Sequence, residues 1–211
     1  MSLDPDAGDA QQLVEFAGRS CYQSFHKPNP ATARNADYIA RTLHGQAHWS
    51  IAEHATATFY LTGVSRALLA EITRHRHLSF SVRSQRFVSE EDASIVIPPA
   101  LRDTDEVFEW GDEADKTGAE ALEWMAGRVS VNYQKLVEAL TDSGLPRKQA
   151  REAARAVLPN MVETRIVVTG NLRAWHEVIE RRTAPDADAE FQQVAGMIRD
   201  ELKKLAPEVF K

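Results

Sequence analysis

The sequence predicts a fold of several helices and a few strands, because the spacing of apolar residues changes along the chain. Residues 117–140 carry apolar side chains at helical spacing, and residues 188–205 also form a helical segment. Residues 55–62 alternate and are rich in threonine and aromatic residues, and residues 163–169 are centred on Thr-Arg-Ile-Val-Val-Thr. Both patterns are typical of strands. A chain of 211 residues can bury one sizeable core, so we expect residues 1–211 to form a single domain.

The other elements are shorter. We expect further helices over residues 11–19, 64–77 and 170–182. Another helix should end at about residue 44, and another should begin at about residue 146. We expect a short strand over residues 95–97. The acidic stretch Asp103–Glu123 contains Lys116 as its only base, and we interpret it as the solvated face of a helix.

Composition excludes several classes of protein. The chain is 43% hydrophobic and 27% charged with a formal net charge of -6, so we expect no non-specific binding to nucleic acid or to an anionic membrane. It has neither an apolar run of membrane-spanning length nor a signal peptide, so we expect a cytoplasmic protein with no membrane partner. The one cysteine, Cys21, excludes a disulfide within the chain, and we expect it to be a small buried residue.

The most informative stretch is residues 74–86, which hold four arginines, two histidines and three serines and no acid. Guanidinium groups bind phosphate or carboxylate oxygens in pairs, and serine hydroxyls complement them. The helix expected over residues 64–77 would place Arg74, His75 and Arg76 at its C-terminal end, where the helix carbonyls do not favour an anion. Phosphate binding must therefore come from side chains and from the loop that follows.

Two other functions suit single features of the sequence. A nucleic-acid-binding module would use the arginines of residues 74–86, but the acidic balance and the lack of a recognisable motif oppose it. A metal-dependent hydrolase would use His48, His54, His75 and His77, but no usual ligand spacing relates them, so we predict no metal site.

The spacing Arg-His-Arg, seven residues, then Ser-x-Arg resembles the signature of flavin-dependent thymidylate synthases. It is formed here by residues 74–76 with Ser84 and Arg86. Residues 48–54, 155–159 and 169–175 also resemble segments of that family, and the resemblance extends from Val14 to the last helix.

This resemblance implies an α+β fold with a central mixed or antiparallel sheet flanked by helices. It implies a homotetramer whose active sites are shared between subunits. Such enzymes carry FAD, which NADPH reduces, and take one carbon from 5,10-methylenetetrahydrofolate to methylate C5 of the pyrimidine nucleoside monophosphate dUMP. The flavin then carries out the hydride chemistry, while the protein supplies position and electrostatic field.

The resemblance also implies roles for single residues. Arg182 matches the catalytic arginine on the uracil, which favours loss of the N3 proton by stabilising the resulting charge. The substrate-binding residues would be Glu71, Arg74, Val82, Arg83, Ser84, Gln85, Arg86, Arg155 and Arg182. The cofactor-binding residues would be Ser50, Arg74, His75, Arg76, Val82, Asn171, Arg173 and Glu177, with His48 on the folate side.

Several positions depart from the family pattern. Val82 stands where the family usually has Gln or Glu, Arg83 replaces an apolar residue, Glu177 replaces Asn or His, and Pro185-Asp186 replaces a Glu-His pair. Loss of a polar contact at Val82 would change discrimination between ribose and deoxyribose. We therefore hypothesise an enzyme that accepts UMP as well as, or instead of, dUMP. A paralogue that binds nucleotide or flavin without turnover is the alternative.

Overall fold

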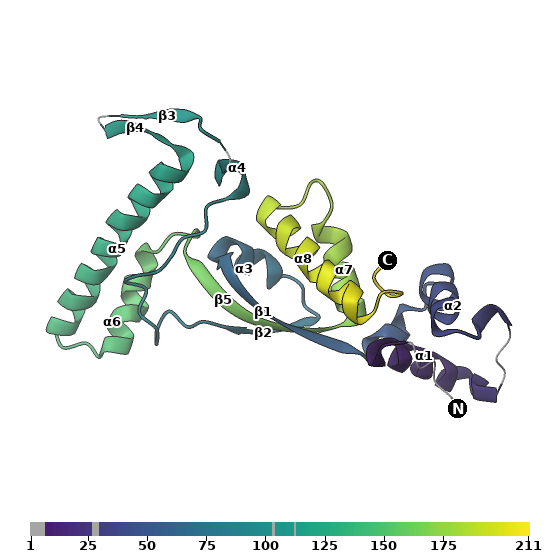
Figure 1. The fold of residues 1–211 in the computed structure, drawn as a ribbon. Helices are drawn as coiled ribbons and strands as arrows, with labels where there is room; N and C mark the ends of the chain where they lie inside the picture. Colours follow the sequence, from purple (N-terminus) through teal and green to yellow (C-terminus); the bar gives the residue numbers. More distant parts are fainter. Residues whose placement is uncertain (1–6, 27–29, 103, 112) are drawn as a thin grey trace. The chain divides into compact units, whose positions relative to one another are not determined.

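The computed structural model describes residues 7–26, 30–102, 104–111 and 113–211 (Figure 1). The chain divides into two compact units, and each is described by itself. The first unit comprises Met1–Phe59, His75–Phe80 and Val168–Lys211. The second unit comprises Tyr60–Arg74 and Ser81–Val167. That residues 1–211 behave as a single domain remains a prediction.

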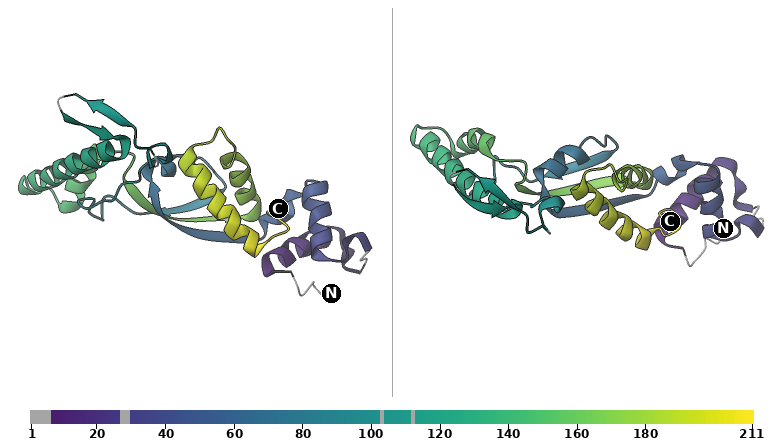
Figure 2. Two further views of the ribbon diagram at one scale, coloured as in Figure 1. Left: turned by 45° about the horizontal axis from the view of Figure 1, so that its top comes forward. Right: turned by 90° about the horizontal axis from the view of Figure 1, so that it is seen from above.

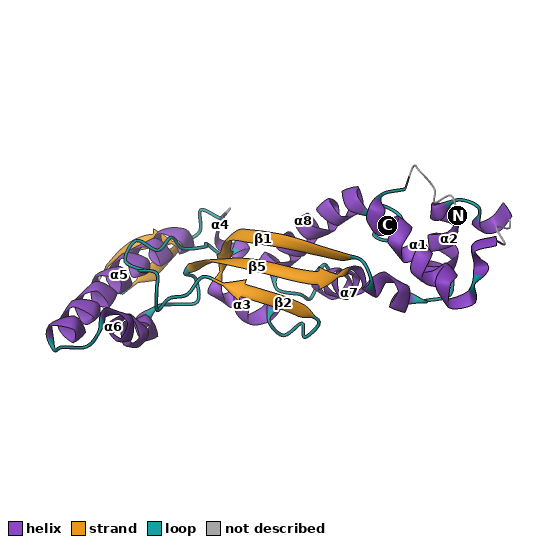
Figure 3. Ribbon diagram, turned by 90° about the horizontal axis from the view of Figure 1, so that it is seen from below, coloured by secondary structure: helices purple, strands orange, loops and turns teal. Residues whose placement is uncertain are grey.

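The main sheet has three strands, β1 (Thr56–Ser65), β2 (Leu78–Val82) and β5 (Glu163–Asn171). Their order is β1-β5-β2, so β5 is the central strand (Figure 3). Together with the helices, this sheet confirms the predicted α+β class. Strand β2 lies inside the basic stretch, which the sequence suggested would be a loop after a helix.

In the first unit, α7 (Leu172–Arg182) and α8 (Ala189–Leu205) lie side by side (Figures 1 and 2). The Asn171 side chain caps α7 by accepting a hydrogen bond from the backbone N–H of Ala174 at 2.8 Å. Trp175 is fully buried, its Nε1–H donates to the carbonyl of Ala57, and its ring meets that of Phe59 edge-on. The helix predicted over residues 170–182 is therefore confirmed, and it buries Leu172, Trp175 and Ile179.

The N-terminal part of the first unit is helical. It consists of α1 (Asp9–Tyr22), α2 (Asn35–Ile39), a π-helical turn (Ala40–Gly45) and 3-10 helices over Ser24–His26, Pro30–Thr32 and Trp49–Glu53. Val14, Ile39 and Leu43 form its core, each with no exposed surface. Cys21 is exposed on the last turn of α1, so the prediction that it is buried was wrong.

In the second unit, α3 spans Arg66–Ile72 and is shorter than the helix predicted over residues 64–77. The Ser65 hydroxyl caps it by accepting from the backbone N–H of Leu68 at 3.0 Å. Because α3 ends at Ile72, residues 74–76 lie beyond the helix rather than on its last turn. The prediction that a helix delivers them was wrong.

The acidic stretch also differs from its prediction. It forms a hairpin of β3 (Val107–Trp110) and β4 (Glu113–Thr117), followed directly by α5 (Gly118–Asp142). Thr117 and Glu120 form a capping box that starts α5. Cross-strand pairing thus replaces the predicted helix over β3 and β4, whereas the part of the stretch from Gly118 onward is helical as predicted. Residues 95–97 form only one bridge, between Ile95 and Val162, rather than a strand.

Helix α5 packs against α6 (Arg147–Ala154), and a short 3-10 helix (Arg155–Val157) follows. The helix α4 (Pro99–Arg102) precedes the hairpin. Of the apolar stripe predicted on α5, Tyr133 is buried, whereas Leu136 is 38% exposed. The other members of that stripe, Leu122, Met125 and Val129, are half-buried. Within the described ranges, no helix is both long and apolar enough to cross a membrane.

Candidate functional site

Arg182 lies at the C-terminal end of α7 and is held by two neighbours within the first unit. Its Nε–H donates to Nε2 of His75 at 3.0 Å, and its guanidinium carbon lies 4.8 Å from the centre of the Phe191 ring. His75 also meets that ring edge-on, and Phe191 is fully buried. Because a guanidinium can only donate, Nε2 of His75 must accept, so the imidazole proton lies on Nδ1.

Sequence reasoning identified Arg182 and His75 separately, although 107 residues lie between them. It missed Phe191, because an apolar residue near the start of a helix carries no functional signal by itself. The cation–π contact fixes the plane of the guanidinium, and the hydrogen bond to His75 fixes its rotation. Arg182 is thus presented in a defined orientation.

Three predicted cofactor residues meet at the N-terminal end of α7. Asn171, Arg173 and Glu177 line a pocket of about 200 Å³ together with Glu53, His77 and Ala174. Arg173 pairs with Glu53 at 2.6 Å and with Glu177 at 3.5 Å. Because one guanidinium faces two carboxylates there, the pocket suits polar uncharged groups such as hydroxyls better than phosphate.

The predicted residues His48 and Ser50 line a second pocket of about 410 Å³, to which Arg173 and Glu177 also contribute. The structure thereby brings the folate-side residue and the flavin-side residues to one region of the first unit. His48 and Ser50 also line a third pocket of about 490 Å³, which includes the exposed Cys21.

His176 and Trp49 line the second pocket and were missed by sequence reasoning. Their ring centres lie 3.7 Å apart with the planes tilted by 48°, a close contact between residues distant in sequence. Burial lowers the pKa of His176, and the charge of Glu180 opposes this effect. The pocket wall is thus aromatic and favours a neutral imidazole.

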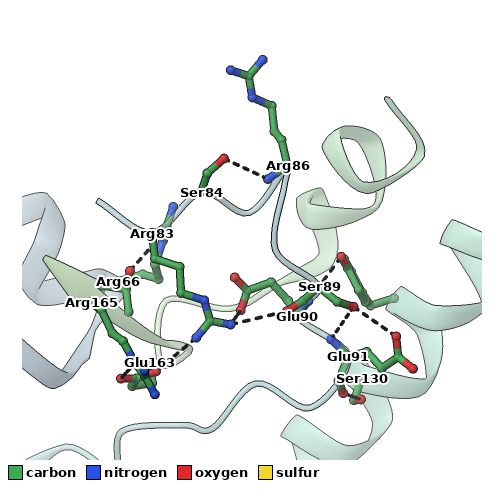
Figure 4. Close-up of polar contacts among 12 residues, drawn as sticks. Arg66, Arg83, Ser84, Arg86, Ser89, Glu90, Glu91, Ser130, Glu163 and Arg165 are labelled. Atoms are coloured by element: carbon green, nitrogen blue, oxygen red, sulfur yellow. Dashed lines mark hydrogen bonds and ion pairs between the residues drawn. The ribbon is translucent and has the colours of Figure 1, made fainter. Parts of the chain in front are cut away.

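In the second unit, the predicted substrate-binding residues Ser84, Gln85 and Arg86 lie on a loop that follows β2. This loop, Ser84–Ser89, is here named the 84–89 loop. Gln85 is buried, and the Ser84 hydroxyl accepts from the backbone N–H of Arg86 at 3.4 Å. Arg86 is half-exposed and pairs with Glu152 at 3.2 Å. In Figure 4 its side chain extends away from the cluster of Arg83 and its carboxylate partners.

Arg155 follows α6 and is exposed. Burial lowers the pKa of the nearby Arg66, Glu90 opposes the shift, and the charges of Arg155 and Arg83 reinforce it. The structure thus gathers several guanidinium groups in one region of the second unit. Sequence reasoning missed Arg66, because it lies outside the basic stretch.

The remaining predicted residues have simpler surroundings. Glu71 and Arg74 lie on the second unit with a 4.0 Å separation between carboxylate and guanidinium, and Arg76 on the first unit is exposed. Val82 ends β2 and is 36% exposed. Arg83 instead turns toward Glu90 and Glu163, at 3.0 and 3.4 Å. Among the described residues, no group of three or more His, Cys, Asp or Glu side chains is arranged to hold a metal ion.

The family model described as thymidylate synthase complementing protein matches residues 5–208. A probable flavin-dependent thymidylate synthase from Mycobacterium phage L5 is 48% identical over 210 residues, which cover 99% of this chain and 83% of the relative. The flavin-dependent thymidylate synthase of Mycobacterium tuberculosis (strain ATCC 25177 / H37Ra) is 45% identical over 209 residues, covering 99% and 81%.

Solved structures support the fold. Thymidylate synthase X from Helicobacter pylori, crystallised with FAD and dUMP, superposes with a TM-score of 0.64 at 22% identity. The match covers 95% of this chain and 94% of that one. The chain therefore belongs to the flavin-dependent thymidylate synthase family.

Proposed function

We propose that this protein methylates C5 of dUMP in a flavin-dependent reaction, with FAD as cofactor, NADPH as reductant and methylenetetrahydrofolate as the one-carbon donor. Its membership of the family supports this function. The observation in the structure that carries it is the contact between Arg182 and His75, two residues of the predicted site that meet at 3.0 Å.

Arg182 would stabilise negative charge on the pyrimidine as the N3 proton leaves. Its guanidinium stays protonated, so it acts as a fixed positive group rather than as a base. Electron density at C5 then rises, and C5 becomes the carbon nucleophile without a covalent bond to the protein. His75 keeps Arg182 in place only while Nε2 can accept, and a proton there would break this hydrogen bond.

The residues around α7 fit part of a flavin. The amide of Asn171 and the hydroxyl of Ser50 offer hydrogen bonds to ring edges or sugar hydroxyls. The pairing of Arg173 with Glu53 and Glu177 makes that pocket a poor phosphate site. Arg76, which is exposed, is better suited to the flavin phosphates. When bound, FAD would supply the redox chemistry.

The second unit would bind the nucleotide phosphate through Ser84, Gln85, Arg86 and Arg155. Val82, at the end of β2, offers no hydrogen bond to a sugar hydroxyl. A site without that polar contact loses a basis for rejecting either sugar. We therefore propose that UMP is accepted along with dUMP.

Association into a homotetramer with shared active sites also remains a proposal. The exposed apolar side chains of Val131 and Leu136 on α5 support association between chains, since exposed apolar surface marks interaction sites.

The assay combines the protein with FAD, NADPH and methylenetetrahydrofolate and follows formation of the methylated nucleotide from dUMP and from UMP. We expect Arg182→Ala to lower kcat by a factor of about 10²–10³, the effect of losing one group that stabilises developing charge. The adjacent exposed Arg181 provides a matched control, and Arg181→Ala should retain turnover.

Two outcomes would contradict these proposals. A wild-type protein that binds FAD but forms no product would favour the non-catalytic paralogue. Turnover of dUMP with none of UMP would remove the proposal on the sugar alone and leave the methylation intact.

A further inference from the structure

We propose that Arg83 is a positioning residue that joins the two ends of the 84–89 loop and so holds Ser84, Gln85 and Arg86 in place for the nucleotide phosphate. The inference rests on the proposed function and goes beyond it, because it assigns Arg83 to the loop rather than to the substrate.

The contacts of Arg83 span the loop. Arg83 directly precedes it, and Nη2 donates to the carboxylate of Glu90, directly after it, at 3.0 Å. The same nitrogen lies 3.4 Å from the backbone carbonyl of Ser89, the last residue of the loop. The guanidinium thus ties the segment entering the loop to the segment leaving it (Figure 4).

A second carboxylate ties Arg83 to the sheet. Nη1 lies 3.4 Å from Glu163, the first residue of β5, and the backbone N–H of Arg83 donates to the carbonyl of Arg165. Glu163 also accepts from the backbone N–H of Gly63 on β1 at 3.1 Å. The start of the loop is therefore anchored to the central strand through both main chain and side chain.

Burial makes this arrangement specific. The side chain of Glu90 is 2% exposed, that of Glu163 is 10% and that of Arg83 is 20%. Within the described chain, Nε of Arg83 is buried without a partner, so the guanidinium commits its terminal nitrogens to the two carboxylates. A buried charge that loses its partner is strongly destabilised, so few alternative positions are open to these groups.

The same contacts make Arg83 unsuitable as a phosphate ligand. Its positive charge is matched by two carboxylates, whereas Arg86 faces away from this cluster and is half-exposed. A preorganised loop binds an anion more tightly, because its binding residues are already ordered before the anion arrives. Arg83 would thus raise phosphate affinity without touching phosphate.

The test replaces Arg83 with Met in the full chain and compares the binding of dUMP and deoxyuridine by calorimetry. The two ligands differ by the phosphate alone, so the Kd of deoxyuridine divided by the Kd of dUMP reports the contribution of the phosphate to binding. We expect Arg83→Met to weaken dUMP binding about tenfold and to leave deoxyuridine binding nearly unchanged. In turnover, KM for dUMP should rise while kcat at saturation stays close to the wild-type value.

Two further variants sharpen the result. Glu90→Gln preserves shape but removes the charge at the far end of the loop, and it should reduce the same Kd ratio by less. It also keeps the test decisive where Arg83→Met fails to fold. Arg128→Met, which removes an exposed ion pair with Glu113, is the matched control and should change the Kd of neither ligand.

Hydrogen exchange separates this inference from the proposed function. Amides of residues 84–88 should exchange faster in Arg83→Met, with or without nucleotide. Unchanged exchange, or equal losses for dUMP and deoxyuridine, would overturn the positioning role alone. A wild-type protein that binds neither ligand would instead refute the proposed function, and the phosphate part of this inference with it.

Discussion

The two units hold their predicted binding residues by different means. In the first unit, Asn171 and Arg173 stand on or beside the first turn of α7, so helix geometry and a cap place them. In the second unit, Ser84 and Arg86 lie on an irregular loop whose ends are joined by the buried charges of Arg83 and Glu90.

This difference predicts how each region fails. A helix cap is local and worth about 1 kcal/mol, so its loss loosens one turn. A buried ion cluster links residues distant in sequence, and loss of one partner leaves another charge unpaired. The following changes test whether the first unit depends on packing and the second on buried charge.

The largest expected effect is in the core beneath α7. Trp175 is fully buried, and Trp175→Ala should lower the free energy of unfolding by about 3–5 kcal/mol, because it leaves a cavity and orphans the carbonyl of Ala57. Urea unfolding measures this change, and Trp175→Phe should lose distinctly less. Similar small losses for both would show that packing does not hold α7.

The next effect concerns charge in the second unit. Glu163→Gln keeps an acceptor for Gly63 but removes the charge that faces Arg83 and Arg165. We expect a loss of about 1–3 kcal/mol in the free energy of unfolding. The control is Glu113→Gln, whose partner Arg128 lies on the surface, and it should change stability by under about 0.5 kcal/mol. Equal effects would remove the distinction between buried and exposed charge.

Helix caps should behave alike in both units. Asn171→Ala in the first and Thr117→Ala in the second should each lower stability by about 1 kcal/mol, since each removes a side-chain acceptor for a first-turn N–H. Hydrogen exchange in the first turns of α7 and α5 would locate the change. A loss several times larger at Asn171 would show that the cap supports more than its helix.

The smallest effects are in pH dependence, where the two units should respond in opposite directions. Burial lowers the pKa of His176 below its ordinary value of 6.5, so its contribution to stability is lost as pH falls from about that value through the folded pKa. Burial raises the pKa of Glu90 above its ordinary value of 4.5, so its contribution is lost as pH rises through the folded pKa.

Unfolding measured across this pH range should separate the two residues. His176→Phe keeps a ring against Trp49 and should flatten the acid side of the stability profile. Glu90→Gln should remove the part of the increase in the free energy of unfolding that Glu90 contributes as pH falls. If the free energy of unfolding changes with pH by the same slope in wild type and variant, the substituted residue does not cause the pH dependence.

The sequence by itself determined those helices and strands whose apolar residues follow the helical or strand period. The helices over residues 172–182 and 189–205 and the strand over 163–171 lie where apolar spacing indicated, because local burial and backbone preference agree there. The family signature likewise singled out His75 and the 84–89 loop, and the wider resemblance singled out Arg182.

Tertiary structure decided the remainder. The acidic stretch became a hairpin because cross-strand pairing overrode its composition, and Cys21 became exposed because α1 buries a different face. The contacts of Phe191 with His75, of His176 with Trp49 and of Glu163 with Arg83 join residues far apart in the chain. No local pattern encodes such contacts, since burial and pairing exist only after the chain has folded.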